Sequence, residues 1–161
     1  MKLLKNKKIF LLLLAASFTG LMIYMAFNMM PGRNAVPECK SVIRLMTPVD
    51  GQIKESTIIL NLVNSGKGEA TFYLRGNFKE GDAKHLLSRK IVADYRYEGG
   101  YYYFSVKDAK KNPVDTISDE DIDSQAFLIN SQHFALKVNK IFDGGYMFSG
   151  VRSPIFICSE D

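Results

Sequence analysis

The sequence has few residues of the kinds that most catalytic and metal sites use. There are only two cysteines, Cys39 and Cys158, and two histidines, His85 and His133, among 161 residues. Neither histidine has a metal-ligand spacing such as the i, i+4 pair of metalloproteases, and no serine stands in a G-x-S-x-G turn. The sequence therefore predicts no catalytic residue, no metal and no cofactor, and we expect that the protein is not an enzyme. The histidines are interpreted as ordinary sheet or surface residues, with pH sensing near pH 6 as their one candidate role.

An excess of positive charge is also missing from most of the chain. The formal net charge of +4 is accounted for by four lysines and Arg33, less Glu38, all within residues 1–38. Residues 39–161 are therefore neutral and offer no basic patch for phosphate contacts. We expect no direct binding to nucleic acid.

One long stretch, residues 9–30, contains no charged residue. As a helix it would be about 33 Å long, enough to cross a hydrocarbon core of about 30 Å. Four lysines precede it and only Arg33 follows closely, which keeps the N-terminus in the cytoplasm. The sequence predicts a cytoplasmic basic stub (1–8), a transmembrane helix (9–30), a linker (31–38) and an extracytoplasmic domain (39–161). The alternative is a cleaved signal peptide, but the apolar run is too long for one.

The two cysteines can now be interpreted. An even number of cysteines in an oxidising compartment favours a disulfide, and with two cysteines the pairing can only be Cys39 with Cys158. Closing so long a loop should stabilise the fold by roughly 4 to 5 kcal/mol in the chain-entropy model. Two free buried thiols are the alternative.

The domain reads as a series of short strands. Residues 57–64 and 69–78 alternate apolar and polar side chains around a glycine-containing turn, which is typical of a β-hairpin. Further strands are predicted at 84–97, 101–108, 132–142, 145–151 and 155–158. Residues 109–125 are the least regular, with one helical turn expected from Ser118. These features predict an all-β domain, an antiparallel curved sheet or small barrel.

Aromatic side chains are frequent at strand spacing. They would form either the core or an apolar pocket, and aromatics at this spacing usually form core. The set is Phe72, Phe78, Tyr95, Tyr97, Tyr102, Phe104 and Phe134.

The layout of the chain resembles a known group of proteins. A lysine-flanked anchor, a cysteine just beyond it, a G-Y-x-F strand and a late S-P-x-F-x-C motif resemble the FidL-like inner-membrane proteins. The same layout is similar to the MyfF and PsaF accessory proteins of fimbrial regulation, and more loosely to ToxS. The similarity of layout covers essentially the whole chain, but its motifs are short. The matching residues are Cys39, Gly145, Tyr146, Phe148, Ser153, Pro154, Phe156 and Cys158.

The resemblance implies a function in gene regulation without DNA binding. Such proteins are single-pass proteins of the bacterial inner membrane, with the C-terminal domain in the periplasm. Their partner is a co-encoded membrane-spanning transcription activator of the ToxR/CadC type, with a cytoplasmic winged-helix domain, which controls virulence or fimbrial genes. The accessory protein binds the activator's periplasmic domain and stabilises or modulates it. The alternative is a periplasmic β domain that binds a small apolar ligand, such as a bile salt or fatty acid.

Overall fold

The computed structural model describes residues 13–25, 34–49, 52–81, 83–118 and 131–160. The chain divides into two compact units, Met1–Ala35 and Val36–Asp161. In the first unit a helix covers residues 13–25, within the predicted span 9–30. Among the residues that the structure describes, no helix has the length and apolar character needed to span a membrane.

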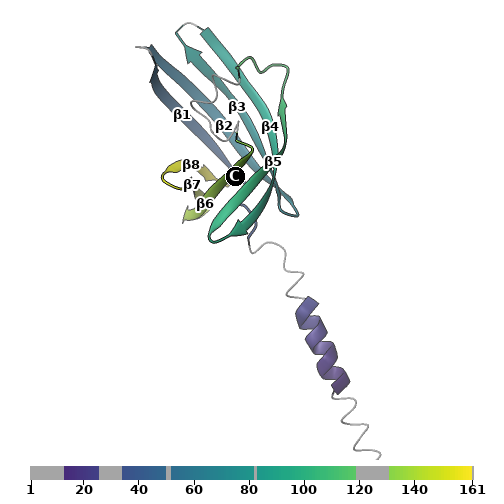
Figure 1. The fold of residues 1–161 in the computed structure, drawn as a ribbon. Helices are drawn as coiled ribbons and strands as arrows, with labels where there is room; N and C mark the ends of the chain where they lie inside the picture. Colours follow the sequence, from purple (N-terminus) through teal and green to yellow (C-terminus); the bar gives the residue numbers. More distant parts are fainter. Residues whose placement is uncertain (1–12, 26–33, 50–51, 82, 119–130, 161) are drawn as a thin grey trace, which may run out of the picture. The chain divides into compact units, whose positions relative to one another are not determined.

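The second unit is a closed antiparallel barrel in which every strand pairs with the next and β1 pairs with β8 (Figure 1). The predicted all-β class, with a sheet that curves into a barrel, is confirmed. The bounds of the eight strands are β1 Cys39–Val49, β2 Gln52–Gly66, β3 Glu69–Glu80, β4 Ala83–Glu98, β5 Tyr101–Lys111, β6 His133–Phe142, β7 Gly145–Ser149 and β8 Pro154–Ser159.

Strand β1 is absent from the sequence-based prediction, whereas all the others are in it. The reason is an unusual distribution of side chains on β1. Ser41, a polar residue, is buried, while Val42 and Met46 are exposed. A strand with a polar side chain inside and apolar ones outside lacks the alternation by which sheets are recognised. The helical turn expected from Ser118 falls on residues 119–130, which lie outside the described residues.

The barrel consists of a long part and a short part. Strands β2, β3 and β4 are paired along almost their whole length. The long part is paired to the short strands over fewer residues, because β5 and β6 share only the pairs from Tyr102↔Leu136 to Ser105↔His133. Between β1 and β8 the one pair is Lys40↔Ser159. The short strands β6, β7 and β8 therefore close the broad sheet at one end only (Figure 1).

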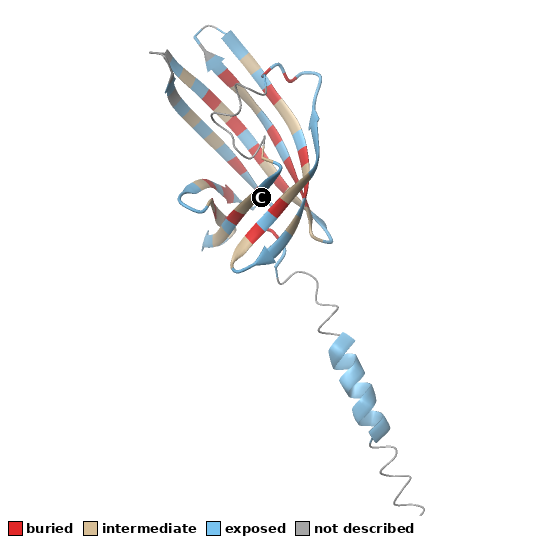
Figure 2. Cartoon of the chain, viewed as in Figure 1, coloured by how far each residue is buried: buried red, intermediate tan, exposed pale blue. Residues whose placement is uncertain are grey.

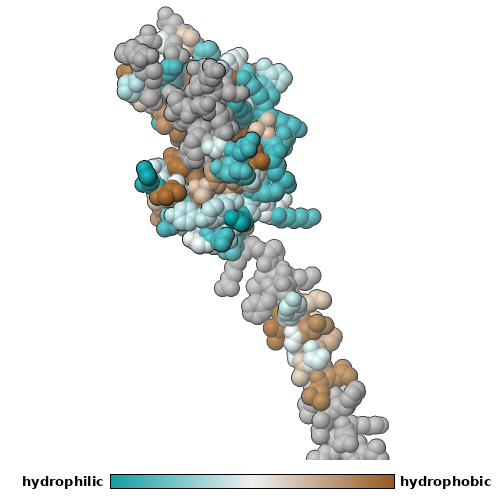
Figure 3. Space-filling model, in the orientation of Figure 1, coloured by the Kyte–Doolittle hydropathy of each residue, from teal (hydrophilic) through white to brown (hydrophobic). Residues whose placement is uncertain are grey.

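Alternate side chains of the long strands fill the interior, so buried and exposed positions alternate along them (Figure 2). Leu60 of β2, Phe72 of β3 and Ile91 of β4 are all buried in one cluster. Gly76 of β3 lies where an added Cβ would collide with the carbonyl oxygen of Thr57 on β2. Glycine thus permits the close approach of two backbones that the tight curvature requires. Outside, the visible surface is largely polar (teal and white in Figure 3), with a few apolar areas.

The segment after β5 covers the part of β4 that β5 does not reach. The N–H of Asn112 donates to the Ser88 carbonyl, and the N–H of Thr116 donates to the Leu86 carbonyl, each at 2.9 Å. The N–H of Ser88 in turn donates to Oδ2 of Asp115 at 2.9 Å. Hydrogen-bonding groups on the edge of β4 are thereby satisfied within the same chain, which is how native sheets avoid pairing with other molecules.

Asp115 also forms the one buried ion pair among the described residues. Its Oδ2 lies 3.1 Å from Nε of Arg89, and the two side chains are 0% and 9% exposed. Nζ of Lys111 lies 3.6 Å from the other carboxylate oxygen. The carboxylate therefore neutralises a guanidinium that points into the barrel, and Ile117 is buried beside it.

Replacing Asp115 by alanine should destabilise the barrel strongly. The substitution removes the buried carboxylate that pairs with the Arg89 guanidinium, and breaking a buried ion pair typically costs about 3–5 kcal/mol. Urea denaturation should show a correspondingly lower free energy of unfolding. Asp108→Ala is the control, because Asp108 pairs with Lys110 on the exposed surface. That change should cost about 1 kcal/mol or less, and equal effects of the two variants would contradict this account.

Candidate functional site

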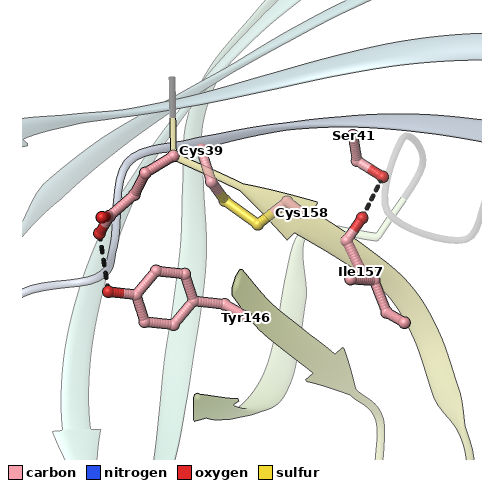
Figure 4. The surroundings of a disulfide bond; sticks show 6 residues. Cys39, Ser41, Tyr146, Ile157 and Cys158 are labelled. Carbon is pink, nitrogen blue, oxygen red and sulfur yellow. Dashed lines mark hydrogen bonds between the residues drawn. A yellow bond between two sulfur atoms is a disulfide. The ribbon is translucent and has the colours of Figure 1, made fainter. Parts of the chain in front are cut away.

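The two cysteines form a disulfide at the joint between the first and the last strand (Figure 4). Cys39 opens β1 and Cys158 lies in β8, with 5.5 Å between the two Cα atoms and 119 positions between them in sequence. Both residues are buried, and neither thiol is free. The predicted pairing is confirmed.

Hydrogen bonds fasten β8 to the strands on either side of it. Oγ of Ser41 on β1 donates to the carbonyl of Ile157 at 2.6 Å. Oη of Tyr146 on β7 donates to Oε1 of Glu160 at 2.7 Å, just beyond the end of β8 (Figure 4). This hydrogen bond to a carboxylate raises the pKa of the Tyr146 hydroxyl. We call the junction of β1 and β8 the seam. It consists of the disulfide, the hydrogen bond from the Ser41 hydroxyl and the single strand pair Lys40↔Ser159.

The segment that leads into β1 is built into the barrel. Val36 is buried, its N–H donates to Oη of Tyr95, and its carbonyl accepts from Nδ2 of Asn64, both at 3.3 Å. Oε1 of Glu38 accepts the backbone N–H of Asn64 at 3.1 Å. The compact unit therefore begins at Val36, three residues before the predicted start of the domain at Cys39.

The residues that carry the family resemblance shape the β7–β8 hairpin. Phe148 and Phe156 stack at 4.6 Å between ring centroids, and Tyr146 lies opposite Cys158. Gly145 is buried where a Cβ would overlap the ring of Phe142. Ser153 and Pro154, the remaining residues of the motif, lie at the turn that joins β7 to β8. The Ser153 carbonyl accepts the N–H of Gly150, and Pro154 begins β8. All these contacts are structural.

The aromatic residues named in the sequence analysis pack mainly on one another. The Phe104 ring lies 5.4 Å from that of Phe72 and 4.9 Å from that of Phe134, measured between centroids. Burial, followed by the neighbouring tyrosines, raises the pKa of Tyr102. Phe72, Phe78, Tyr102 and Phe104 are buried, Tyr95 and Phe134 are partly buried against the core, and Tyr97 is exposed. The geometry is that of a filled interior.

The two histidines lie at different places in the barrel. His85 is half-buried in β4 opposite Phe78 of β3. His133 begins β6 opposite Ser105, which itself stands in a β5 segment paired with Asp94. His85 and Asp94 are nine positions apart along β4, which corresponds to about 30 Å at the rise of a strand. The structure does not bring the histidines together.

His133 lies in a surface hollow of about 650 Å³ over β4, β5 and β6. Its Nδ1 is 2.8 Å from Oγ of Ser105. A serine nucleophile would need a base that a third group orients, but the nearby Asp94 is paired with Lys107 at 2.9 Å. In the described part of the chain, no group of three or more histidine, cysteine, aspartate or glutamate side chains could hold a metal ion. What this hollow offers is hydrogen bonding and aromatic contact.

No protein-family model matches this chain, and no curated protein matches it. The resemblance of the hairpin residues to the FidL-like proteins therefore stays a prediction.

Sequence reasoning missed two features that the structure brings forward. One is Asp115, whose role depends on a partner 26 positions away in sequence. The other is the apolar outer side of β1, where Val42 and Met46 are exposed. The sequence of residues 40–45, K-S-V-I-R-L, has adjacent polar and adjacent apolar residues and so carried no alternation signal for that strand.

Removing either cysteine should weaken the barrel by the same amount. Cys39→Ser and Cys158→Ser each abolish the cross-link, which contributes roughly 4 to 5 kcal/mol in the chain-entropy model. Limited proteolysis and urea denaturation should show equal losses, and the double variant should be no less stable than either single one. Wild-type protein treated with a reductant is the control and should match the variants. Additive losses would mean that the cysteines act separately.

Proposed function

We propose that this protein is a membrane-anchored accessory protein of the bacterial inner membrane whose barrel lies in the periplasm. There it binds a co-encoded, membrane-spanning transcription activator of the winged-helix type and stabilises or modulates it. Residues 9–30 would anchor the chain, and residues 1–8 would remain in the cytoplasm. Direct contact with DNA forms no part of this function.

The observation that carries the proposal is the Cys39–Cys158 disulfide, which closes the barrel at its seam. Disulfides persist in oxidising compartments, which agrees with a domain outside the cytoplasm. Eight residues, 31–38, separate the uncharged stretch from Cys39, so the proposed tether between anchor and barrel is short. Two proteins confined to one membrane meet at a raised effective concentration, and a modest interface is then sufficient.

A second candidate function is the binding of a small apolar ligand, such as a bile salt or fatty acid. The observation that favours it is the hollow over β4, β5 and β6. Its lining includes the exposed ring of Tyr103 and the side chain of Ala135 beside the polar pair of Ser105 and His133. Pockets for small molecules commonly combine apolar walls with a few polar groups in this way.

The compartment is tested with reporter fusions. Alkaline phosphatase fused after residue 40 should be active, because the four lysines before the uncharged stretch hold the N-terminus inside. A reporter that works only in the cytoplasm should be inactive at the same point. The reverse pattern would overturn the proposed topology. A mature chain that starts near residue 18 and washes off membranes would identify a signal peptide.

The partner is tested by deletion. Loss of this protein should lower the steady-state level or the transcriptional output of the co-encoded membrane activator, because its periplasmic domain loses a stabilising contact. Immunoblots and a reporter of the regulated promoter measure the two quantities. Expression of the chain from a plasmid is the control and should restore both. If neither quantity changes, the accessory role fails and ligand binding becomes the better account.

A further inference from the structure

Four apolar side chains form a row across the outside of the barrel, and we call them the outer row: Met147 (β7), Ile157 (β8), Val42 (β1) and Ile59 (β2). Met147 lies opposite Ile157, and Val42 lies opposite Ile59. The pair Lys40↔Ser159, continued by two residues, places Val42 opposite Ile157. The row is therefore continuous over four neighbouring strands.

The outer row is exposed on three of its four strands, and Met46 of β1 and Ile53 of β2 are exposed apolar residues on the same side of the sheet. Val42, Ile59 and Ile157 are 61%, 50% and 53% exposed, although the outer side of an antiparallel sheet is normally polar. On β4 the outward positions are mostly charged, with Lys90, Asp94 and Arg96 exposed, and Leu86 is the one exposed apolar side chain among them. Contiguous exposed apolar residues typically mark an interaction site.

Unpaired cations border the outer row. Arg44 follows Val42 by two positions on the same face of β1, and Arg75 of β3 lies directly opposite Ile59. Both arginines are exposed, and neither has an ion-pair partner among the residues that the structure describes. Exposed arginines beside an apolar surface favour a partner that supplies carboxylates.

The row also crosses the disulfide seam. Ile157 directly precedes Cys158, Val42 follows Cys39 by three positions, and the hydroxyl of Ser41 holds the Ile157 carbonyl. The two halves of the row are therefore adjacent only while β8 lies beside β1. A break of the seam would divide the surface as well as weaken the fold.

Charge and composition favour one occupant over two others. A second copy of this chain would bring its own Arg44 and Arg75 against the same arginines, which is unfavourable. A lipid surface usually binds elements with tryptophan, phenylalanine or leucine on the apolar side, and the row has none of these. A protein surface with an apolar centre and acidic residues around it is complementary both to the apolar outer row and to the arginines Arg44 and Arg75 beside it.

We propose that the outer row is the docking surface for the periplasmic domain of the membrane activator, and that the activator presents an apolar patch bordered by aspartate or glutamate. This inference rests on the proposed function and names the surface that performs it. Four strands span about 14 Å, so the row is the centre of an interface, with the polar residues around it excluding water.

The test uses the full-length protein in its native membrane together with a tagged activator. A photo-crosslinking residue at position 157 should capture the activator. Val42→Glu should reduce that capture about tenfold, because it places a carboxylate against an acidic partner. Val114→Glu is the matched control: Val114 is also an exposed valine, at 57%, but it lies after β5. It should leave the capture unchanged.

A second pair of variants tests the charges. Arg75→Glu should reduce the capture, and Arg96→Glu, on the outer side of β4, should leave it unchanged. Unfolding midpoints of all four variants should match that of the wild type, which separates lost docking from lost folding. Equal capture in Val42→Glu and Val114→Glu would overturn the proposed surface.

The remaining outcomes distinguish the alternatives. Cross-linked dimers of this chain would show that the outer row binds a second copy. Val42-dependent binding to vesicles of phosphatidylethanolamine and phosphatidylglycerol would show that it binds lipid. A photo-crosslinking residue placed at position 114 serves as a comparison. Capture of the activator from position 114 but not from 157 would reject the outer row as the docking surface and leave the proposed function standing. No capture from either position, with an activator level that is independent of this protein, would reject both.

Discussion

A closed sheet needs one joint at which its first strand meets its last, and in this protein that joint is held mainly by a covalent bond. The other joints use runs of backbone pairs, but β1 and β8 share a single pair, Lys40↔Ser159. The Cys39–Cys158 disulfide and the hydroxyl of Ser41 supply what the hydrogen-bond ladder lacks. Closure, the filled interior and the continuity of the outer surface all depend on this joint.

Beside the first residues of β4, which β5 does not reach, an irregular segment completes the wall of the barrel. The segment 112–117 takes the place of a strand beside β4, and the Asp115 carboxylate neutralises the Arg89 guanidinium. A buried ion pair is a costly way to fill space, since two charges lose their water. In this protein the ion pair fixes the path of segment 112–117, which forms no regular strand.

Much of the barrel could be read from the sequence, because β2 and β3 alternate apolar and polar side chains and β2 to β5 are separated by glycine turns. Residues such as Gly66, Gly68, Gly99 and Gly100 have positive φ, as those turns require. The disulfide followed from a cysteine count and an expected compartment. Strand β1 could not be read, because Ser41 points inward and Val42 outward. The outer row was equally hidden: it joins residues up to 115 positions apart, and only the register of the strands brings them together.

The position of the joint also decides when the barrel can form. Strands β2 to β5 pair with neighbours in sequence and can assemble as hairpins, but β8 lies 119 positions from the residue to which it is linked at Cys39. Folds dominated by such distant contacts form slowly. Until β8 arrives, β1 keeps a free edge that other chains can pair with. The yield of folded protein should therefore depend on how fast the two cysteines are oxidised to the disulfide, and slow oxidation would favour aggregation over closure.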